Sequence, residues 1–337
     1  MKSIQNTLIN ERSTWLITGC AGFIGSHIAE KLISTGQRVV GLDNLSTGLQ
    51  SNIELLESLA NQSDGSFTFH KESITNYEKC LELTKNTDYV IHQAALGSVP
   101  RSIENPIASF ESNILGFINI LEASRQNNVK SFVFASSSSV YGDNLEQPKK
   151  EENTGNALSP YACSKITDEI IGLNYHFTYG MNVIGLRYFN VFGSRQNPEG
   201  PYAAVIPKWI EAFLNKKPVE IFGDGTTSRD FCFIQNTVEA NILAALNTNG
   251  NAFGKVYNIA CSESTSLNEI YQVISTQLKN KGIKLCQDIP IYKDFRKGDI
   301  KDSLASISRA EEFLNYKPLV MVNEGLKKTV DWYLENL

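Results

Sequence analysis

The sequence predicts an α/β protein built on a doubly wound parallel sheet, with a second, smaller α/β lobe. Short apolar runs alternate with helical patterns over residues 14–187, and such alternation favours parallel strands joined by crossover helices. A glycine-rich turn, residues 19–25, follows the first apolar run directly. The alternation then loosens, and residues 190–234 are rich in Gly, Pro, Asn and Arg, which indicates that a different lobe begins there.

The composition is that of an ordinary globular protein and narrows the classes of function. Of 337 residues, 42% are hydrophobic and 20% are charged, and the formal net charge of −5 does not favour a general nucleic-acid binder. No apolar run could cross a bilayer, and residues 1–13 lack the apolar core of a signal peptide. The six cysteines form no Cys-x-x-Cys pair, and the four histidines lack metal-ligand spacing. We therefore expect a cytoplasmic protein with reduced, mostly buried thiols, no metal, and no nucleic-acid or membrane partner.

The first half of the chain predicts five strands separated by helices. The strands are expected at the apolar runs 14–18, 38–42, 67–70, 89–92 and 131–135. Helices are expected at 26–34, closed by Gly36, in the stretch that ends near residue 60, and at 104–128. We expect His92, which ends the fourth strand, to be a satisfied histidine of the core.

The second half begins with a clearly marked helix at residues 160–179. Ser159 suits an N-cap and Pro160 suits the first helical position. A sixth strand at 182–187, a helix near 203–215, a helix and strand within 235–260 that could return to the sheet, and short elements over 262–337 follow. The expected division is a sheet domain of residues 1–189 and 235–261, and a discontinuous lobe of residues 190–234 and 262–337.

The glycine turn predicts a bound dinucleotide. Gly19, Gly22 and Gly25 follow the first strand and Asp43 ends the second, in the order strand, glycine turn, helix, strand, acid. The glycines allow close approach of the backbone to a pyrophosphate, which the helix amides then face, and Asp43 would accept hydrogen bonds from the adenosine ribose. The spacing Gly-x-x-Gly-x-x-Gly departs from the plainer Gly-x-Gly-x-x-Gly, and a tight turn without a ligand is the alternative.

Two further motifs point to chemistry at one edge of the sheet. Serines 136–139 follow the fifth strand, and ligands of open parallel sheets bind outside the carboxyl ends of the strands; a bare polyserine loop is the alternative. Tyr161 and Lys165 are four residues apart and share one helix face. An ammonium favours the phenolate, so Tyr161 could act as a base near neutral pH. The alternative is a surface lysine leaning on a tyrosine ring.

Together these three motifs resemble the extended short-chain dehydrogenase/reductase family, which acts on nucleotide sugars. The resemblance covers nearly the whole chain and continues through residues 186–193, 223–231, 257–260 and 295–299. Residues 95–102 and 202–207 are similar to the bacterial UDP-N-acetylglucosamine 4-epimerases that serve surface-polysaccharide synthesis. The family implies that the sheet domain is a Rossmann-like NAD-binding domain and that the discontinuous lobe binds the UDP-sugar.

The resemblance also implies a role for each matching position. Ser137 matches the catalytic serine, Tyr161 the base, and Lys165 the residue that lowers the tyrosine's pKa and holds the nicotinamide ribose. Contacts to NAD are implied for Gly19, Gly22, Phe23, Ile24, Gly25, Asp43, Asn44, Ser46, Thr47, Gly48, Ser73, Ile74, Gln93, Ala94, Ala95, Asn113, Tyr161, Lys165, Tyr188 and Val191. Contacts to the UDP-sugar are implied for Gly97, Ser98, Ser137, Ser138, Ser139, Tyr161, Asn190, Ala204, Val205, Trp209, Arg229, Arg296, Asp299 and Ser303. At position 73, where relatives carry an aspartate that contacts the adenine, a serine can still accept a hydrogen bond.

The implied reaction is epimerisation at carbon 4 of a UDP-sugar. Tyr161 takes the proton of the hydroxyl, NAD takes the hydride, and the hydride returns to the other face of the 4-keto sugar. Strict UDP-galactose epimerases carry a tyrosine where this chain has Ser303, and the smaller residue would leave room for an N-acetyl group. The resemblance therefore predicts interconversion of UDP-N-acetylglucosamine and UDP-N-acetylgalactosamine.

Four alternatives remain. One is a 4-epimerase of UDP-N-acetylglucuronic acid or UDP-glucose, and two others are a UDP-glucuronate decarboxylase and a nucleotide-sugar dehydratase. The fourth is a non-catalytic NAD-sensing protein, although such proteins commonly lose the Tyr-Lys pair. Residues 137–139 lack the carboxylates that dehydratases and decarboxylases of the family use. The apolar positions of helices 104–128 and 160–179 could form a homodimer interface, as in relatives, or belong to the core.

Overall fold

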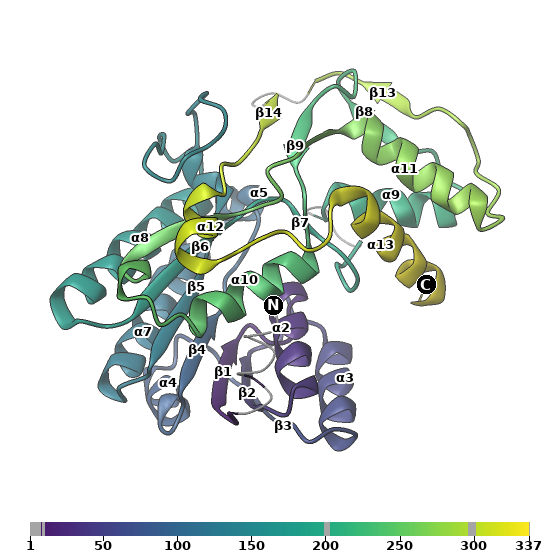
Figure 1. The fold of residues 1–337 in the computed structure, drawn as a ribbon. Coiled ribbons are helices and arrows are strands. Elements are labelled where there is room, and N and C mark those ends of the chain that lie inside the picture. The colour runs from purple at the N-terminus through teal and green to yellow at the C-terminus, as the bar shows by residue number, and fades with distance from the viewer. Residues whose placement is uncertain (1–7, 9–10, 199–202, 296–300, 337) are drawn as a thin grey trace.

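The computed structural model of the chain describes residue 8 and residues 11–198, 203–295 and 301–336 (Figure 1). Seven strands form its central sheet in the order β11-β6-β5-β4-β1-β2-β3, and each neighbouring pair is parallel. The strands are β1 (Thr14–Thr18), β2 (Arg38–Asp43), β3 (Ser66–Lys71), β4 (Tyr89–His92), β5 (Ser131–Ser137), β6 (Val183–Tyr188) and β11 (Lys255–Ile259). The predicted parallel sheet is confirmed, and all six strands expected before residue 190 are present.

Helices cover both faces of this sheet. The helices α2 (Phe23–Ser34), α3 (Gln50–Asn61) and α10 (Ile234–Ala245) pack on one face, and α4 (Tyr77–Thr84), α7 (Gly116–Gln126) and α8 (Pro160–Tyr179) pack on the other. Along β1, Trp15 and Ile17 belong to the core of the first face, whereas Leu16 belongs to the core of the second. Successive side chains of a strand point to opposite faces, so a sheet covered on both sides requires the uninterrupted apolar run that the sequence shows.

The long helix α8 begins and ends where the sequence predicts. The Ser159 hydroxyl accepts a hydrogen bond from the amide of Ala162 at 3.1 Å, and Pro160 is the first helical residue. At the other end Gly180 adopts the left-handed conformation, with φ of 69°, and its amide donates to the carbonyl of His176 at 2.9 Å. Because α8 connects two neighbouring parallel strands, β5 and β6, its first turn lies at the carboxyl edge of the sheet.

The single helix expected at residues 104–128 is wrong in its start and in its continuity. The helical chain begins earlier, with α5 (Val99–Glu104), and restarts as α6 (Pro106–Phe110) before the π-helical turn η1 (Glu111–Leu115) leads into α7. Asn105 separates α5 from α6 because the residue before a proline is driven out of the helical region, and its side chain caps α6 through the amide of Ala108 at 3.1 Å. Sequence periodicity alone does not report a π-turn.

The second lobe is assembled from short elements on both sides of α10 and β11. Its strands pair as β7 (Val191–Phe192) with β10 (Cys232–Phe233), as β9 (Ser228–Asp230) between β12 (Ser264–Ser266) and β14 (Asp302–Ser303), and as β8 (Glu220–Phe222) with β13 (Ile291–Lys293). Its helices are α9 (Val205–Leu214), α11 (Leu267–Asn280) and α13 (Val322–Asn336), whereas α12 (Ser308–Leu314) packs against β11. Figure 1 shows α9, α11 and α13 clustered beyond the carboxyl edge of the sheet. One buried apolar cluster includes both Trp15 and Leu278, so the core is continuous.

Three expectations concern groups that the structure shows directly. All six cysteines are free, and four are buried while Cys163 and Cys286 are exposed, so the prediction of mostly buried, unpaired thiols is confirmed. Within the described ranges no helix is long and apolar enough to cross a membrane, and no group of three or more His, Cys, Asp or Glu side chains could hold a metal ion. His92 is buried as expected and its Nδ1 bonds the Thr18 hydroxyl at 2.8 Å, but its Nε2 has no partner in the part of the chain described.

Candidate active site

The glycine turn brings backbone segments closer together than a side chain would permit. Gly19 has φ of +71°, and a Cβ there would lie 2.7 Å from the backbone nitrogen of Ala94. A Cβ on Gly25 would lie 2.1 Å from the carbonyl oxygen of Gly19. The turn therefore holds the start of α2 against the ends of β1 and β4, where the strand order reverses. The first-turn amides of α2, at Phe23, Ile24 and Gly25, have no carbonyl partner one turn earlier, so they are available to an anion.

Asp43 ends β2 beside this turn. Its Oδ2 accepts a hydrogen bond from the amide of Ala21 at 3.0 Å, and its Oδ1 accepts one from the amide of Leu45 at 2.8 Å. Burial raises the pKa of the Asp43 carboxyl, while these two backbone donors lower it. A carboxylate has about four acceptor positions, so Asp43 is fixed by the backbone and can still accept from a ligand hydroxyl.

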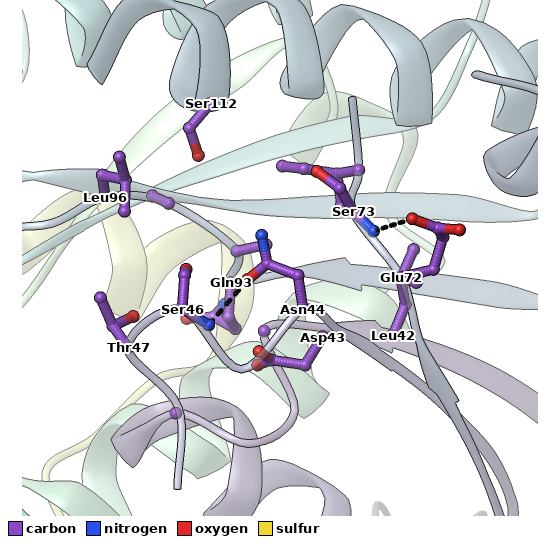
Figure 2. A pocket seen from close by; sticks show the side chains of 15 residues that line it. Leu42, Asp43, Asn44, Ser46, Thr47, Glu72, Ser73, Gln93, Leu96 and Ser112 are labelled. Carbon is purple, nitrogen blue, oxygen red and sulfur yellow. Dashed lines mark hydrogen bonds between the residues drawn. The ribbon is translucent and has the colours of Figure 1, made fainter. Parts of the chain in front are cut away.

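A cavity opens between the glycine turn, the ends of β2, β3 and β4, and η1. Figure 2 shows Asp43 and Asn44 on one side, Ser73 and Glu72 on another, and Ser112 across from them. The predicted cofactor contacts that line it are Gly19, Gly22, Asp43, Asn44, Ser46, Thr47, Ser73, Ile74, Gln93, Ala94 and Ala95. Gly48 lies behind the lining, where a Cβ would be 2.6 Å from the Cβ of Ala21. This lining fits a dinucleotide: backbone without side chains for a pyrophosphate, and a half-buried carboxylate for a ribose.

A hydrogen-bond network continues the cavity wall behind Gln93. Its Nε2 donates to the hydroxyl of Tyr188 at 2.9 Å and to Oδ1 of Asn241 at 3.1 Å. Burial raises the pKa of Tyr188, so this phenol stays protonated. Val191 lies in β7, beyond the end of β6. The network connects the ends of β4 and β6 with α10.

Asn113 supports the wall of the cavity by hydrogen bonds, and it is not among the residues that line the cavity. Its Oδ1 accepts from the amide of Leu96 at 2.7 Å, and its Nδ2 donates to the carbonyl of Leu96 at 3.3 Å and to the hydroxyl of Ser164 at 3.1 Å. The side chain is 1% exposed. Asn113 therefore ties the loop after β4 to α8, one residue before Lys165.

The serine cluster bends from the strand into a short helical turn. Ser137 is the last residue of β5, and its hydroxyl accepts from the amide of Ser139 at 3.1 Å at the start of the 3₁₀ turn η2 (Ser138–Tyr141). The Ser139 hydroxyl is buried and has no hydrogen-bond partner among the described residues. A buried hydroxyl without a partner is unusual in proteins, and this one lies at the edge where ligands of such sheets bind.

Tyr161 and Lys165 lie on the first turns of α8, which packs against β5 and η2. The amide of Tyr161 donates to the hydroxyl of Ser102 at 3.0 Å, which ties this turn to α5. The Lys165 ammonium is buried and donates to the carbonyl of Ala135 at 3.0 Å. The helix therefore places the phenol and the ammonium on the side of the sheet edge where β5 ends in Ser137.

A second cleft, of about 770 Å³, lies between elements of the smaller lobe and the start of α5. Its volume is in the range of small-molecule sites. Of the predicted sugar and UDP contacts, Ser98, Asn190, Val205, Trp209 and Arg229 line it. Ser98 has φ of 92°, a strained conformation for a residue other than glycine, and such residues concentrate at functional sites.

The other predicted substrate contacts lie around this cleft or outside it. Gly97 borders open space, since nothing would lie within 4 Å of a Cβ there, and Ala204 precedes the first residue of α9. Ser303 belongs to β14 and is the register partner of Arg229 on β9, but it is not among the lining residues. Arg296 and Asp299 lie outside the described residues.

Sequence reasoning missed several residues of both linings. In the first cavity these are Leu42, Glu72, Leu96 and Ser112. Glu72 directly follows β3, so its place at the carboxyl end of a parallel strand could have revealed it. In the second cleft they are Val99, Pro100, Ala203, Lys208, Ala212, Pro218, Val219, Glu220, Phe222, Thr227, Phe231 and Leu267. Lys208 is three residues after Val205 on α9, a helical spacing that places both on one face.

Comparison with known proteins decides which family these features belong to. Residues 15–260 match the model of the NAD dependent epimerase/dehydratase family. The chain belongs to this family. It is therefore an enzyme of the NAD-dependent UDP-sugar 4-epimerase group, which confirms the resemblance and the cofactor predicted from the sequence.

Relatives of this epimerase-family chain match it over almost its whole length. The UDP-N-acetylglucosamine 4-epimerase of Methanobrevibacter ruminantium, solved with UDP-N-acetylmuramic acid, is 38% identical, with a TM-score of 0.87 over 97% of this chain and 100% of that one. The UDP-glucose 4-epimerase of Thermus thermophilus, solved with NAD, is 31% identical, with a TM-score of 0.81 over 96% and 100%. A UDP-glucuronate 4-epimerase of Thermodesulfobacterium geofontis is 34% identical over 96% of this chain and 97% of its own.

Proposed function

We propose that the enzyme interconverts UDP-N-acetylglucosamine and UDP-N-acetylgalactosamine. The observation that carries the choice of sugar is Ser303 in β14, in register with Arg229, whose side chain lines the second cleft. Ser303 is half-buried and small, so it would take up less space beside Arg229 than a tyrosine would. The 38% identity to a protein named UDP-N-acetylglucosamine 4-epimerase supports the same choice.

The two clefts support a division of labour. We propose that residues 1–189 with 235–261 bind NAD and that residues 190–234 with 262–337 bind the UDP-sugar. Arg229, with its planar guanidinium, suits the diphosphate. The Asn190 side chain donates to the carbonyl of Asp230 at 3.0 Å, which holds it at the mouth of the second cleft beside the strand that carries Arg229.

Three side chains at the sheet edge suit the chemistry. Tyr161, as a phenolate, takes the proton of the 4-hydroxyl and later returns it to the epimerised alkoxide. The side chain of Lys165 lies one helical turn away, and an ammonium beside a phenol favours the phenolate. Ser137 holds the reacting oxygen by a hydrogen bond. NAD supplies the hydride acceptor and donor at carbon 4 when it is bound.

The competing reactions need groups that this edge lacks. Water elimination requires an additional acid and base at the substrate, and positions 138 and 139 are serines. The 4-epimerases of other UDP-sugars share the same chemistry and differ only in the sugar. The alternative substrates are therefore UDP-glucose, UDP-glucuronic acid and UDP-N-acetylglucuronic acid.

The experiment is a comparison of four substrates followed by NMR. The purified enzyme is incubated separately with UDP-N-acetylglucosamine, UDP-glucose and the two corresponding uronic acids. We expect the acetylated, uncharged sugar to be converted with the highest kcat/KM. In Ser303→Tyr, conversion of acetylated sugars should collapse while some activity on plain UDP-hexose remains. Equal behaviour of Ser303→Tyr and the parent enzyme on both sugars would remove Ser303 from this role.

We also propose that the enzyme is a homodimer. Five large apolar side chains of α5, α6, η1 and α8 are exposed on elements that pack together: Ile103 at 61%, Ile107 at 77%, Leu115 at 47%, Ile170 at 64% and Phe177 at 76%. Apolar exposure of this extent on neighbouring helices is typical of an interface. Light scattering should give twice the chain mass, and Ile107→Glu should halve it. Leu145→Glu, at a residue 86% exposed on a loop, is the matched control and should leave the mass unchanged.

A further inference from the structure

The Lys165 ammonium has a buried charge partner on its own helix. Besides the carbonyl of Ala135, Nζ donates to Oδ2 of Asp168 at 3.1 Å. The side chains of Lys165 and Asp168 are 3% and 0% exposed, so water does not screen the pair. An ammonium has three N–H donors, and these two contacts leave one for a ligand.

Burial of the Asp168 carboxylate costs folding free energy, which argues that the residue has a function beyond packing. Its Oδ1 is buried and has no hydrogen-bond partner among the described residues. Burying a carboxylate with an unsatisfied oxygen is unfavourable, and a neutral residue at this position would avoid that cost. Burial raises the pKa of the Asp168 carboxyl to about 7, Lys165 lowers it, and Glu169 raises it further. The buried position of Asp168 therefore works against its charged form, and the Lys165 ammonium works for it.

We propose that Asp168 is a positioning residue that acts through Lys165 and sets the pH at which Tyr161 becomes a base. The carboxylate fixes the ammonium against the end of β5 and leaves one N–H for the bound cofactor. Its negative charge also offsets part of the positive field that Lys165 exerts on Tyr161. The proposal rests on the role proposed above for Tyr161, and it names the residue that tunes that role.

The size of the effect follows from helix geometry. Tyr161 and Asp168 are seven residues apart on α8, or roughly 10 Å along the helix axis. A unit charge at that distance, in surroundings with an effective dielectric constant of about 20, shifts a pKa by roughly one unit. Loss of the carboxylate charge should therefore move the acid limb of the kcat/KM profile to lower pH by roughly half a unit to one unit, since Asp168 itself is ionised for only part of this range.

Other titratable groups lie near the pair, and none of them is substituted in the variants tested. Glu169 acts electrostatically on Asp168 from the same helix, and Lys165 and Tyr161 act in the same way on His92 at the end of β4 and on Tyr188 in β6, respectively. Burial, with Lys165 as a second cause, lowers the pKa of His92 to about 3, so this ring is neutral throughout. The remaining titratable side chains of elements that pack on α8 are Arg101, Glu104, Glu111, Glu122, Arg125, Tyr141 and Arg187.

The test compares pH profiles of kcat/KM for the NAD-loaded enzyme and its variants. In Asp168→Asn the acid limb should move to lower pH by roughly half a unit to one unit, because the neutral amide no longer offsets the charge of Lys165. Asp168→Glu retains the negative charge, so the acid limb of its kcat/KM profile should lie at the same pH as in the parent. Asp64→Asn, the same change at an exposed position, is the control for net charge. An unchanged acid limb in Asp168→Asn contradicts the proposal.

A second measurement follows Tyr161 without turnover. The ultraviolet absorbance of the phenolate is titrated in the NAD-loaded parent, and the same titration of Tyr161→Phe is subtracted. Coupling to Asp168 predicts a curve broader than that of one independent site, and a single-site curve contradicts the proposal even if no neutral variant folds. If the parent converts no UDP-sugar but this curve is broad, the proposed function fails and the coupling stands. If the parent is active, the acid limb is unchanged in Asp168→Asn and the titration curve fits a single site, only the role of Asp168 fails.

Discussion

The two clefts of this enzyme are built in different ways. The first depends on a close backbone turn: Gly19 and Gly25 leave no room for a Cβ, and the carboxylate of Asp43 is held by two amides. The second is built from side chains that three separated stretches of the chain contribute, among them Trp209 on α9 and Arg229 on β9. The first cleft therefore depends on glycines, which lack a Cβ, and the second depends on particular side chains. A cofactor common to a family suits the first kind of site, and a variable sugar suits the second.

The largest effect is expected at Tyr161, in the first turn of α8. Tyr161→Phe removes one hydroxyl from a half-buried position and leaves the packing of α8 intact. Turnover should fall by roughly a hundredfold or more, the usual scale for a positioned acid–base group, while bound NAD and the unfolding temperature stay close to those of the parent. Activity within a few-fold of the parent would exclude Tyr161 as the base.

The next largest effect is expected at the glycine turn of the first cleft. In Gly25→Ala the new Cβ would lie 2.1 Å from the carbonyl of Gly19, so the glycine turn must shift away from α2. We expect the NAD retained after purification to fall by about tenfold, since about 1.4 kcal/mol of binding energy corresponds to that factor. Gly250→Ala is the matched control, because nothing lies within 4 Å of a Cβ there. NAD content is measured in the supernatant of the denatured protein, and full retention in Gly25→Ala would contradict the account.

A smaller effect is expected in the side-chain-built cleft. Arg229→Lys keeps the charge but loses the planar fork that matches phosphate oxygens. The KM for the UDP-sugar should rise about tenfold with little change in NAD content, as expected for the loss of one charge-assisted contact. Arg38→Lys, on an exposed residue at the opposite end of the strands, should leave both unchanged. A loss of NAD in Arg229→Lys would show that the two clefts are not separable.

The smallest effect concerns stability and pH in the smaller lobe. Asp230 accepts from the amides of Cys261 at 2.9 Å and Ala305 at 3.2 Å, and burial raises its pKa to about 6. Because the folded pKa lies above the ordinary value, the folded protein favours the protonated carboxyl, and this stabilisation is lost as the pH rises through about 6. Between pH 4 and pH 7 (roughly the window between the two pKa values) the unfolding temperature of the parent should therefore fall by a few degrees relative to Asp230→Asn. Parallel curves for the parent and Asp230→Asn would contradict this sign.

The sequence predicted the first cleft better than the second for a physical reason. Strand, glycine turn, helix and acid lie within residues 14–43, so local spacing reports their geometry. The second cleft needs contacts between β8, β9, α9 and α11, which local spacing does not report, and Thr227 and Leu267 were missed there. The broken helix before α7 was also missed, although Pro106 marks one of its ends.

At the catalytic pair, too, local sequence spacing predicts only part of the arrangement. The spacing of Tyr161 and Lys165 on one helix face follows from the sequence, and so does the i,i+3 spacing of Lys165 and Asp168. Spacing does not report burial, however, and only the fold shows that Asp168 is completely enclosed with one oxygen unpaired. A charged pair on a solvated face would have little effect on Tyr161, whereas this pair is buried and its lysine lies one helical turn from the proposed base.

We propose that carbon 4 of an acetylated UDP-sugar is inverted by removal and return of its own hydride, with Tyr161 moving only the hydroxyl proton. The most direct measurement is NMR of UDP-N-acetylglucosamine incubated in D₂O with the purified enzyme and no added cofactor. The account predicts that UDP-N-acetylgalactosamine forms and that its carbon 4 carries protium, because the transferred hydride does not exchange with water. Deuterium at carbon 4, or no conversion of the acetylated sugar while plain UDP-glucose or a UDP-uronic acid is epimerised, would contradict it.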